Sequence, residues 1–220
     1  KINMKKIVIV GAGGLAREVK WLIDDINRIN NQYEFLGYIV SNKENLKETD
    51  SKDLIIGDFS WFDSLKNESI HVAIGIGNPK HRIDISNILC QNDKVIFPSL
   101  IHPSVIYDEG TCSIGKGVIL CANNILTVNI KINDFALINL ACAIGHESEI
   151  GEGVVINSKA KISGGVSIGK GSLIGTSASI LQYRSVGSFS TLGASSCLTR
   201  SIPNEVTAFG VPAKIIKTKL

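Results

Sequence analysis

Residues 138–167 read INLACA-IGHESE-IGEGVV-INSKAK-ISGGVS, five consecutive blocks of six that each begin with isoleucine. The same period runs without a break from residue 114 to residue 198, and a branched aliphatic residue opens every block. A fixed period of this kind is the signature of a repeat architecture. The fifteen opening positions are Ile114, Leu120, Leu126, Ile132, Ile138, Ile144, Ile150, Ile156, Ile162, Ile168, Ile174, Ile180, Val186, Leu192 and Leu198.

The six-residue period excludes the ordinary alternatives. Helical amphipathicity repeats every 3.6 residues and sheet strands alternate every two, so neither fits. An aliphatic first position with a small or β-branched fifth position is typical of a parallel β-helix, in which short strands and tight turns stack coil on coil. Gly or Asn often follows the aliphatic residue, and we expect these residues where turns need left-handed backbone angles.

Composition sets outer bounds on the protein. With 220 residues, 44% of them hydrophobic, the chain is long enough for one large or two small domains. A net charge of +3 is too small to indicate a nucleic-acid partner. No apolar run approaches the ~18 residues of a membrane span and no signal peptide precedes the first predicted strand, so we expect no membrane insertion and a cytoplasmic location. The five cysteines lack a C-x-x-C spacing and indicate small apolar fillers in a reducing compartment.

A strand, a glycine-rich turn and a helix open the chain. An apolar run at residues 5–10 is followed by GAGGLA and then by a helical pattern to about residue 29. This satisfies G-x-G-x-x-A, so Gly11, Gly13 and Gly14 are candidates to bind a phosphate at the helix N-terminus. The alternative is a tight turn that binds nothing. Further strands are predicted near residues 35–40, 54–56, 72–76 and 95–97, with a helix over 80–90, which together indicate a small Rossmann-like α/β domain.

The end of the second strand favours a nucleotide other than NAD. A dinucleotide site needs an acidic residue there to hold the ribose, whereas this strand ends Val40-Ser41-Asn42. We therefore predict a nucleotide phosphate on the glycine turn. Ser41 and Asn42 are predicted to hydrogen-bond the base or ribose.

Proline and the end of the repeat set the predicted domain boundaries. Residues 4–100 form the α/β domain, residues 101–203 the β-helix, and residues 204–220 a C-terminal cap or tail. The irregular segment 104–113 is predicted to cap the first coil, because solenoids need such caps. The basic tail is predicted to cover the last coil.

His146 is the candidate for chemistry within the repeat. Because the inward positions form the core, a functional group must lie on an outward or corner position, and His146 does. Histidine is the side-chain type that most readily exchanges a proton near neutral pH, so it can remove a proton from an acceptor amine or hydroxyl. Glu147 is placed to orient it, and Asn139 lies about one corner earlier. The alternative is a solvated histidine without a role.

Two other chemistries are less well supported by the sequence. A zinc site on a β-helix needs three converging imidazoles, and the repeat with its cap offers only His102 and His146, so no metal is predicted. A nucleotidyltransferase needs paired carboxylates, and the acidic residues of the α/β domain are scattered. The lysines of the column either solubilise it or meet the phosphates of coenzyme A: Lys159, Lys161, Lys170, Lys214, Lys217 and Lys219.

Taken together, these motifs resemble the two-domain hexapeptide-repeat sugar acetyltransferases, which include sialic acid O-acetyltransferases and bacillosamine-pathway nucleotide-sugar N-acetyltransferases. The resemblance covers nearly the whole chain. It rests on these stretches: IVIVGAGG at 7–14, AIGIGN at 73–78 followed by Arg82, Asn139, IGHE at 144–147, ISGGV at 162–166 and GVPAK at 210–214.

The resemblance implies a left-handed β-helix of five triangular coils that assembles as a homotrimer. Acetyl-coenzyme A would lie in the clefts between columns, against Gly164, Gly165 and Lys214. A nucleotide-sugar acceptor would reach it from the α/β domain, where Asn78 joins the substrate-binding residues. His146 would act as general base in a direct acetyl transfer, assisted by Glu147 with Asn139 nearby. The alternative is a non-catalytic scaffold of the same fold that binds sugar nucleotides.

The chain departs from the N-acetyltransferase pattern at two places. Val155 stands where that branch usually carries a further histidine, and Leu15-Ala16 replace His-Gly in the glycine turn. The first departure favours a hydroxyl acceptor, and the choice between nitrogen and oxygen stays open.

Overall fold

The N-terminal domain is a five-stranded parallel sheet with the strand order β3-β2-β1-β4-β5. The computed structural model describes residues 4–41, 52–65 and 68–218. The elements of this domain are β1 (Lys5–Val10), α1 (Gly14–Ile29), β2 (Tyr33–Ile39), η2 (Lys52–Leu54), β3 (Ile55–Gly57), η3 (Phe59–Ser64), β4 (Ile70–Ile74), α2 (Pro79–Leu89) and β5 (Val95–Ile96).

The two faces of this sheet are covered by different helices. Ile7 and Ile9 pack with the buried stripe of α1, whereas Val8 and Val10 pack with Leu89 of α2 and with the η3 segment. Successive residues of a strand point to opposite faces, so a strand buried on both sides is apolar throughout. The predicted Rossmann-like domain is confirmed.

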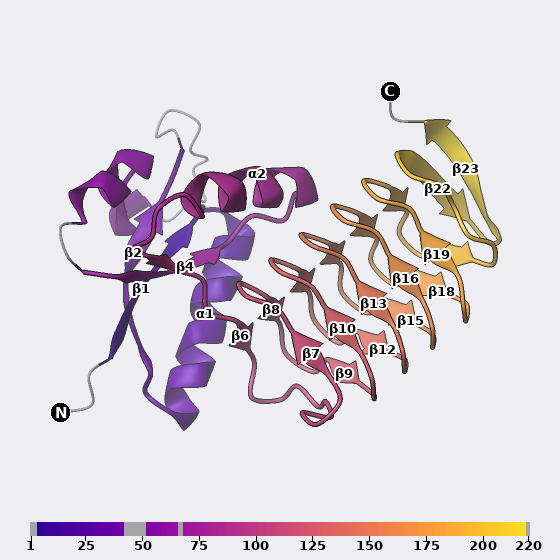
Figure 1. Ribbon diagram of the computed structural model, residues 1–220, viewed down its shortest axis with the longest axis horizontal. Helices are drawn as coiled ribbons and strands as arrows, with labels where there is room; N and C mark the ends of the chain where they lie inside the picture. The colour runs from indigo at the N-terminus through magenta and orange to yellow at the C-terminus, as the bar shows by residue number, and fades with distance from the viewer. Residues whose placement is uncertain (1–3, 42–51, 66–67, 219–220) are drawn as a thin grey trace.

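The repeat forms a column of fifteen two-residue strands in three parallel sheets (Figure 1). We name these the β7, β8 and β9 sheets after their first hexapeptide strands; three strands make one coil, and three corners separate the sheets. The strands are β7 (Ser113–Ile114), β8 (Ile119–Leu120), β9 (Ile125–Leu126), β10 (Lys131–Ile132), β11 (Leu137–Ile138), β12 (Ala143–Ile144), β13 (Glu149–Ile150), β14 (Val155–Ile156), β15 (Lys161–Ile162), β16 (Ser167–Ile168), β17 (Leu173–Ile174), β18 (Ser179–Ile180), β19 (Ser185–Val186), β20 (Thr191–Leu192) and β21 (Cys197–Leu198).

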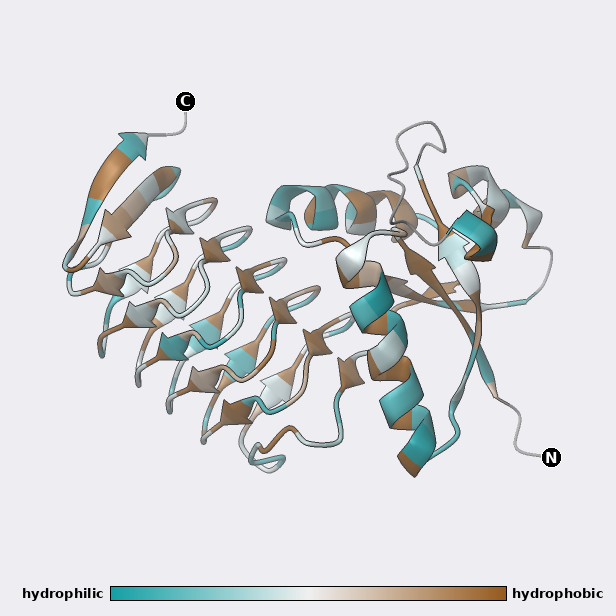
Figure 2. Cartoon of the chain, turned by 180° about the vertical axis from the view of Figure 1, so that it is seen from behind, coloured by the Kyte–Doolittle hydropathy of each residue, from teal (hydrophilic) through white to brown (hydrophobic). Residues whose placement is uncertain are grey.

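Every strand of the column ends on a predicted first position of the repeat. Equivalent residues one coil apart pair in register, as in Ile132 with Ile150 and Ile150 with Ile168. These side chains stack inside the column, where Ile150 is fully buried. Figure 2 shows the resulting hydrophobic segments recurring from coil to coil. The predicted left-handed parallel β-helix is confirmed.

The expected position of the left-handed backbone angles was wrong. The fourth residue adopts positive φ in fourteen of the fifteen hexapeptides, for example +61° at Glu147 and +67° at Gly165. The second-position glycines are required for a different reason. A Cβ atom on Gly145 would lie 2.6 Å from the backbone nitrogen of Gly164, and one on Gly175 would lie 2.4 Å from that of Ala194. Glycine at the second position therefore lets adjacent coils approach closely.

The α/β domain packs on the outer face of the β8 sheet. Outward-facing Ile119, Leu137 and Val155 of this sheet are about 1% exposed, because they share an apolar cluster with α1. Leu15 packs against the same cluster. Both departures from the N-acetyltransferase pattern therefore contribute apolar side chains to the domain junction.

Arg82 fixes α2 at this junction. Its side chain is fully buried and donates to three main-chain carbonyl oxygens, those of Ile74 at 2.6 Å, Ile76 at 2.9 Å and Phe135 at 3.1 Å. Burial lowers the pKa of the guanidinium to about 10, so the group stays charged at neutral pH. The bond to Phe135 crosses from the α/β domain to the column.

The ends of the column are built differently. At the α/β end, β6 (Leu100–Ile101) already pairs with β8. At the far end, β22 (Val206–Gly210) pairs with β20, and β23 (Ala213–Thr218) returns antiparallel to it, so the β8 sheet continues past the last coil. Figure 1 shows this hairpin at the opposite end of the column from the α/β domain. None of the helices in the described ranges is both long and apolar enough to cross a bilayer.

Candidate active site

His146 lies in an outward turn of the column, between β12 and β13. Half of its side chain is exposed, and Nδ1 lies 3.6 Å from Oε2 of Glu147, within ion-pair range but beyond a hydrogen bond. The backbone of Glu147 is held in the left-handed region and donates its N–H to the carbonyl of Val128 on the preceding coil. The corner between the β9 and β7 sheets thus presents an imidazole beside a carboxylate, as predicted.

The other ring nitrogen of His146 faces Gly164 on the next coil. A Cβ atom at Gly164 would lie 2.5 Å from both Nε2 and Cε1 of His146, so the ring rests directly on this glycine. Across the described ranges, the N–H of Gly164 donates no hydrogen bond, whereas the N–H of Gly165 donates to the carbonyl of His146 at 2.7 Å. A base and an uncommitted backbone donor therefore lie side by side.

Asn139 lies at a different corner from His146. It follows β11, at the corner between the β8 and β9 sheets, and its Oδ1 accepts a hydrogen bond of 2.8 Å from the N–H of Leu140. The full width of the β9 sheet separates the two corners. Within one chain, the structure therefore does not bring Asn139 to His146.

The glycine turn lies at the carboxyl end of β1, against the carboxyl end of β4. Gly11 has φ of +107°, and a Cβ atom there would lie 2.9 Å from the carbonyl oxygen of Gly75. Gly13 is the N-cap of α1 and supplies no side-chain hydrogen bond. A Cβ atom at Gly14 would meet nothing closer than 3.9 Å, so this face of the turn is open. Backbone N–H groups at such a helix start can hold a phosphate.

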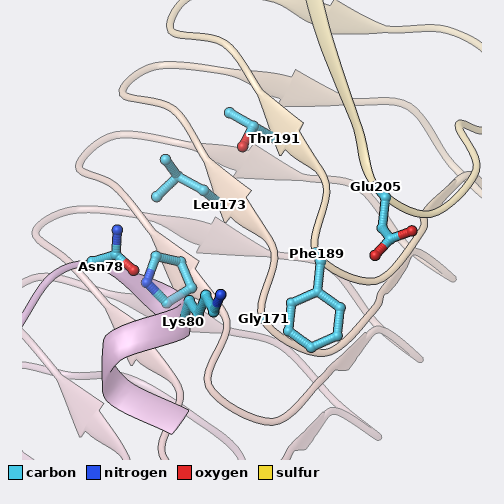
Figure 3. Close-up of a pocket in the computed structure, with 8 residues that line it drawn as sticks. Asn78, Lys80, Gly171, Leu173, Phe189, Thr191 and Glu205 are labelled. Atoms are coloured by element: carbon cyan, nitrogen blue, oxygen red, sulfur yellow. The ribbon is translucent and has the colours of Figure 1, made fainter. Parts of the chain in front are cut away.

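Asn78 lies at the same edge of the sheet and borders a cavity (Figure 3). It is the N-cap of α2, and its Oδ1 accepts from the N–H of His81 at 3.1 Å. The cavity has a volume of 470 Å³ and lies between the first turn of α2, the corner that joins the β7 and β8 sheets, and the segment before β22. It is lined by Asn78, Pro79, Lys80, Gly171, Leu173, Phe189, Thr191 and Glu205.

The remaining predicted residues are spread over the molecule. Ser41 is exposed just after β2, and Asn42 lies outside the described residues. Lys214 is exposed on β23, opposite Phe209. Lys170 forms an ion pair of 2.9 Å with Glu152, which indicates a structural role for this lysine.

The sequence analysis missed the aromatic side chains at the turns. Tyr183 and Phe189 occupy the fourth hexapeptide position with φ of +56° and +55°, where glycine or asparagine is favoured. That departure is a signal in the sequence. An expectation of left-handed angles at the second residue hides this signal.

His102 does not join a metal site. Its Nε2 lies 3.1 Å from Oδ2 of Asp25 on α1, and its Nδ1 lies 2.7 Å from Oγ of Ser104, so it links the two domains. Within the described ranges, no three His, Cys, Asp or Glu side chains gather in a way that could hold a metal ion.

Comparisons with known proteins agree with this architecture. A family model described as PglD N-terminal domain matches residues 6–89. The acetyltransferase domain of PglB from Neisseria gonorrhoeae FA1090 is 26% identical, with a TM-score of 0.85 over 96% of this chain and 100% of that one. WeeI from Acinetobacter baumannii AYE is 28% identical, with a TM-score of 0.83 over 97% and 100%. No curated protein matches the chain in sequence.

A third solved structure has the same fold at lower identity. Perosamine N-acetyltransferase from Caulobacter crescentus, solved as a mutant in complex with CoA and GDP-perosamine, is 22% identical. Its TM-score is 0.85 over 99% of each chain.

The match over nearly the whole chain to the acetyltransferase domain of PglB supports an acyltransferase. Residues 6–89 match the PglD N-terminal domain model, and the chain as a whole is similar to the acetyltransferase domain of PglB and to WeeI.

Proposed function

We propose that this chain transfers the acetyl group of acetyl-coenzyme A directly to an amino or hydroxyl group of a nucleotide-linked sugar, in the cytoplasm, during synthesis of a bacterial surface glycan. The observation that carries the proposal is the exposed His146 beside Glu147 and over the unoccupied N–H of Gly164. The PglB domain has also been solved with acetyl coenzyme A, and perosamine N-acetyltransferase with CoA and a GDP-linked sugar, which supports this pair of substrates.

The proposed reaction is a direct transfer in which His146 carries the proton. Once the 3.6 Å contact shortens to a hydrogen bond in the substrate complex, Glu147 would favour the tautomer with the proton on Nδ1 of His146, which leaves the lone pair of Nε2 free. Nε2 takes the proton of the acceptor as its nitrogen or oxygen bonds to the thioester carbon. The carbonyl oxygen becomes an oxyanion, and we assign its stabilisation to the N–H of Gly164. The carbon–sulfur bond then breaks, and the leaving thiolate receives the proton from His146.

The acceptor is proposed to bind at the carboxyl edge of the α/β sheet. Its phosphates lie on the turn of Gly11, Gly13 and Gly14, and its sugar extends past Asn78 into the 470 Å³ cavity. Lys80 on the cavity rim supplies a positive charge for the diphosphate.

The site is proposed to form between chains of a homotrimer. The cavity borders the corner between the β7 and β8 sheets, whereas His146 lies at the corner between the β9 and β7 sheets. A corner of one column must therefore approach the acceptor edge of a neighbour.

A thiol-release assay with acetyl-coenzyme A and a panel of nucleotide-linked amino sugars and sialic acids tests the reaction. His146→Ala should lose about 100- to 10,000-fold in turnover while keeping the fold. His81→Ala, which truncates an exposed histidine on α2, should keep wild-type turnover. Turnover of His146→Ala equal to wild type would overturn the assignment of the base.

Mixed trimers test the placement between chains. Gly14→Glu puts a carboxylate into the open face of the phosphate turn and should abolish acceptor binding. Co-expression of Gly14→Glu with His146→Ala should restore part of the activity, because some interfaces then pair two intact halves. No recovery in verified mixed trimers would refute a shared site.

The scaffold alternative makes a separate prediction. A binding module would bind a sugar nucleotide but release no thiol with any acceptor on the panel.

A further inference from the structure

Tyr183 is an exposed aromatic residue in an uncommon backbone conformation. It has φ of +56° and leaves 68% of its surface exposed. The left-handed region disfavours a bulky residue, and solvent gives the ring no burial in return. The fold alone would be served better here by glycine or asparagine.

The ring of Tyr183 lies over Gly165. A Cβ atom at Gly165 would lie 2.3 Å from Cδ1 and 2.5 Å from Cε1 of the tyrosine. Tyr183 also donates its N–H to the carbonyl of Gly164 at 3.0 Å, which fixes it one coil beyond the glycine pair.

His146 and Tyr183 approach that glycine pair from opposite sides. His146 belongs to the preceding coil and covers Gly164, whereas Tyr183 belongs to the following coil and covers Gly165. The base, the free backbone donor and the aromatic ring therefore form one continuous surface along the corner.

The other aromatic residues at fourth positions lie in different environments. Phe135 covers Gly117 and is 4% exposed beneath the α/β domain. Phe189 covers Gly171 and lines the cavity at the same corner. Tyr183 shares their contact with glycine, but it is far more exposed and lies at the corner that carries the base.

We infer that Tyr183 is a donor-binding residue whose ring packs against the pantetheine arm of coenzyme A as the thioester reaches His146. This inference rests on the proposed function. The donor must place its carbonyl at Gly164, and an arm that leaves along this corner toward the C-terminal end of the column passes over Tyr183. A flat ring suits an arm of methylene and amide groups, which buries apolar surface without needing a charge.

Calorimetric titration with coenzyme A separates this inference from the reaction itself, because no acceptor is needed. Tyr183→Ala should weaken coenzyme A binding about tenfold, a loss typical of one removed aromatic contact. Tyr183→Asn suits the left-handed turn and should lose as much, so that a folding defect is distinguished from a lost contact. Tyr183→Phe keeps the ring and should bind as wild type does.

Trp21→Ala is the control, since it removes an exposed ring from α1, away from the corner that carries His146, and should leave coenzyme A affinity within about twofold. In turnover assays, the KM for acetyl-coenzyme A should rise in Tyr183→Ala and Tyr183→Asn while kcat changes little, as for contacts kept from ground state to transition state. Wild-type affinity in both ring-deleted variants would overturn the inference. Failure of wild type itself to bind coenzyme A would overturn the proposed function first.

Discussion

Gly164→Ala should inactivate the site through His146 alone. The new methyl group would lie 2.5 Å from Nε2 and Cε1 of His146, whereas carbon atoms in contact lie about 3.5 Å apart, so the ring must move by about 1 Å. The backbone of Gly164 is outside the left-handed region, so alanine is compatible with its conformation. Since a misplacement of about 1 Å can cost about 100-fold in rate, we expect kcat to fall by that factor, or about 2.7 kcal/mol of transition-state stabilisation.

The assay is thiol release at saturating substrates, with thermal unfolding measured in parallel. Gly110→Ala is the matched control, because its Cβ atom would meet nothing closer than 3.5 Å, and it should keep full activity. In the His146→Ala background, Gly164→Ala should cause no further loss, since the group that it displaces is already gone. Full activity of Gly164→Ala, or an equal further loss in that background, would refute the reasoning.

Three further predictions concern stability and reactivity. Arg82→Met should destabilise the protein by about 3 kcal/mol in urea unfolding, because three buried carbonyl oxygens lose their donor; an unchanged midpoint would contradict this. Ile156→Ala should cost about 3 kcal/mol by leaving a cavity in the column, and a loss below about 1 kcal/mol would argue against tight stacking there. Burial raises the pKa of Cys121 to about 12 and that of Cys142 to about 11, so both thiols stay protonated at pH 8. Iodoacetamide should therefore label exposed Cys90 in the native protein, and Cys121 and Cys142 only after unfolding. Mass spectrometry of the labelled peptides measures this.

The fold could be predicted because each hexapeptide repeats the same packing problem. Each first-position residue, such as Ile150, stacks on its equivalents one coil away, so a period of six in the sequence maps directly onto the column. The turn conformation could not be read in the same way. Glycine serves two purposes in this repeat, positive φ at Gly165 and close approach of coils at Gly145, and composition does not distinguish them.

The site was only partly predictable, because the corner of the column at which a residue lies decides its neighbours, and closeness along the chain does not. His146 and Glu147 are adjacent in sequence and share one turn, so the pair was visible in the sequence.

Asn139 is only seven residues from His146, yet the strand β12 carries the chain across a whole face of the column between them. Tyr183 is thirty-seven residues away, close to two full coils of eighteen, and it returns to the same corner. In a β-helix, separation by multiples of eighteen therefore predicts neighbours better than proximity in sequence does. Asn139 stands at another separation and lies at another corner, so any role for it beside His146 depends on the proposed contact between chains.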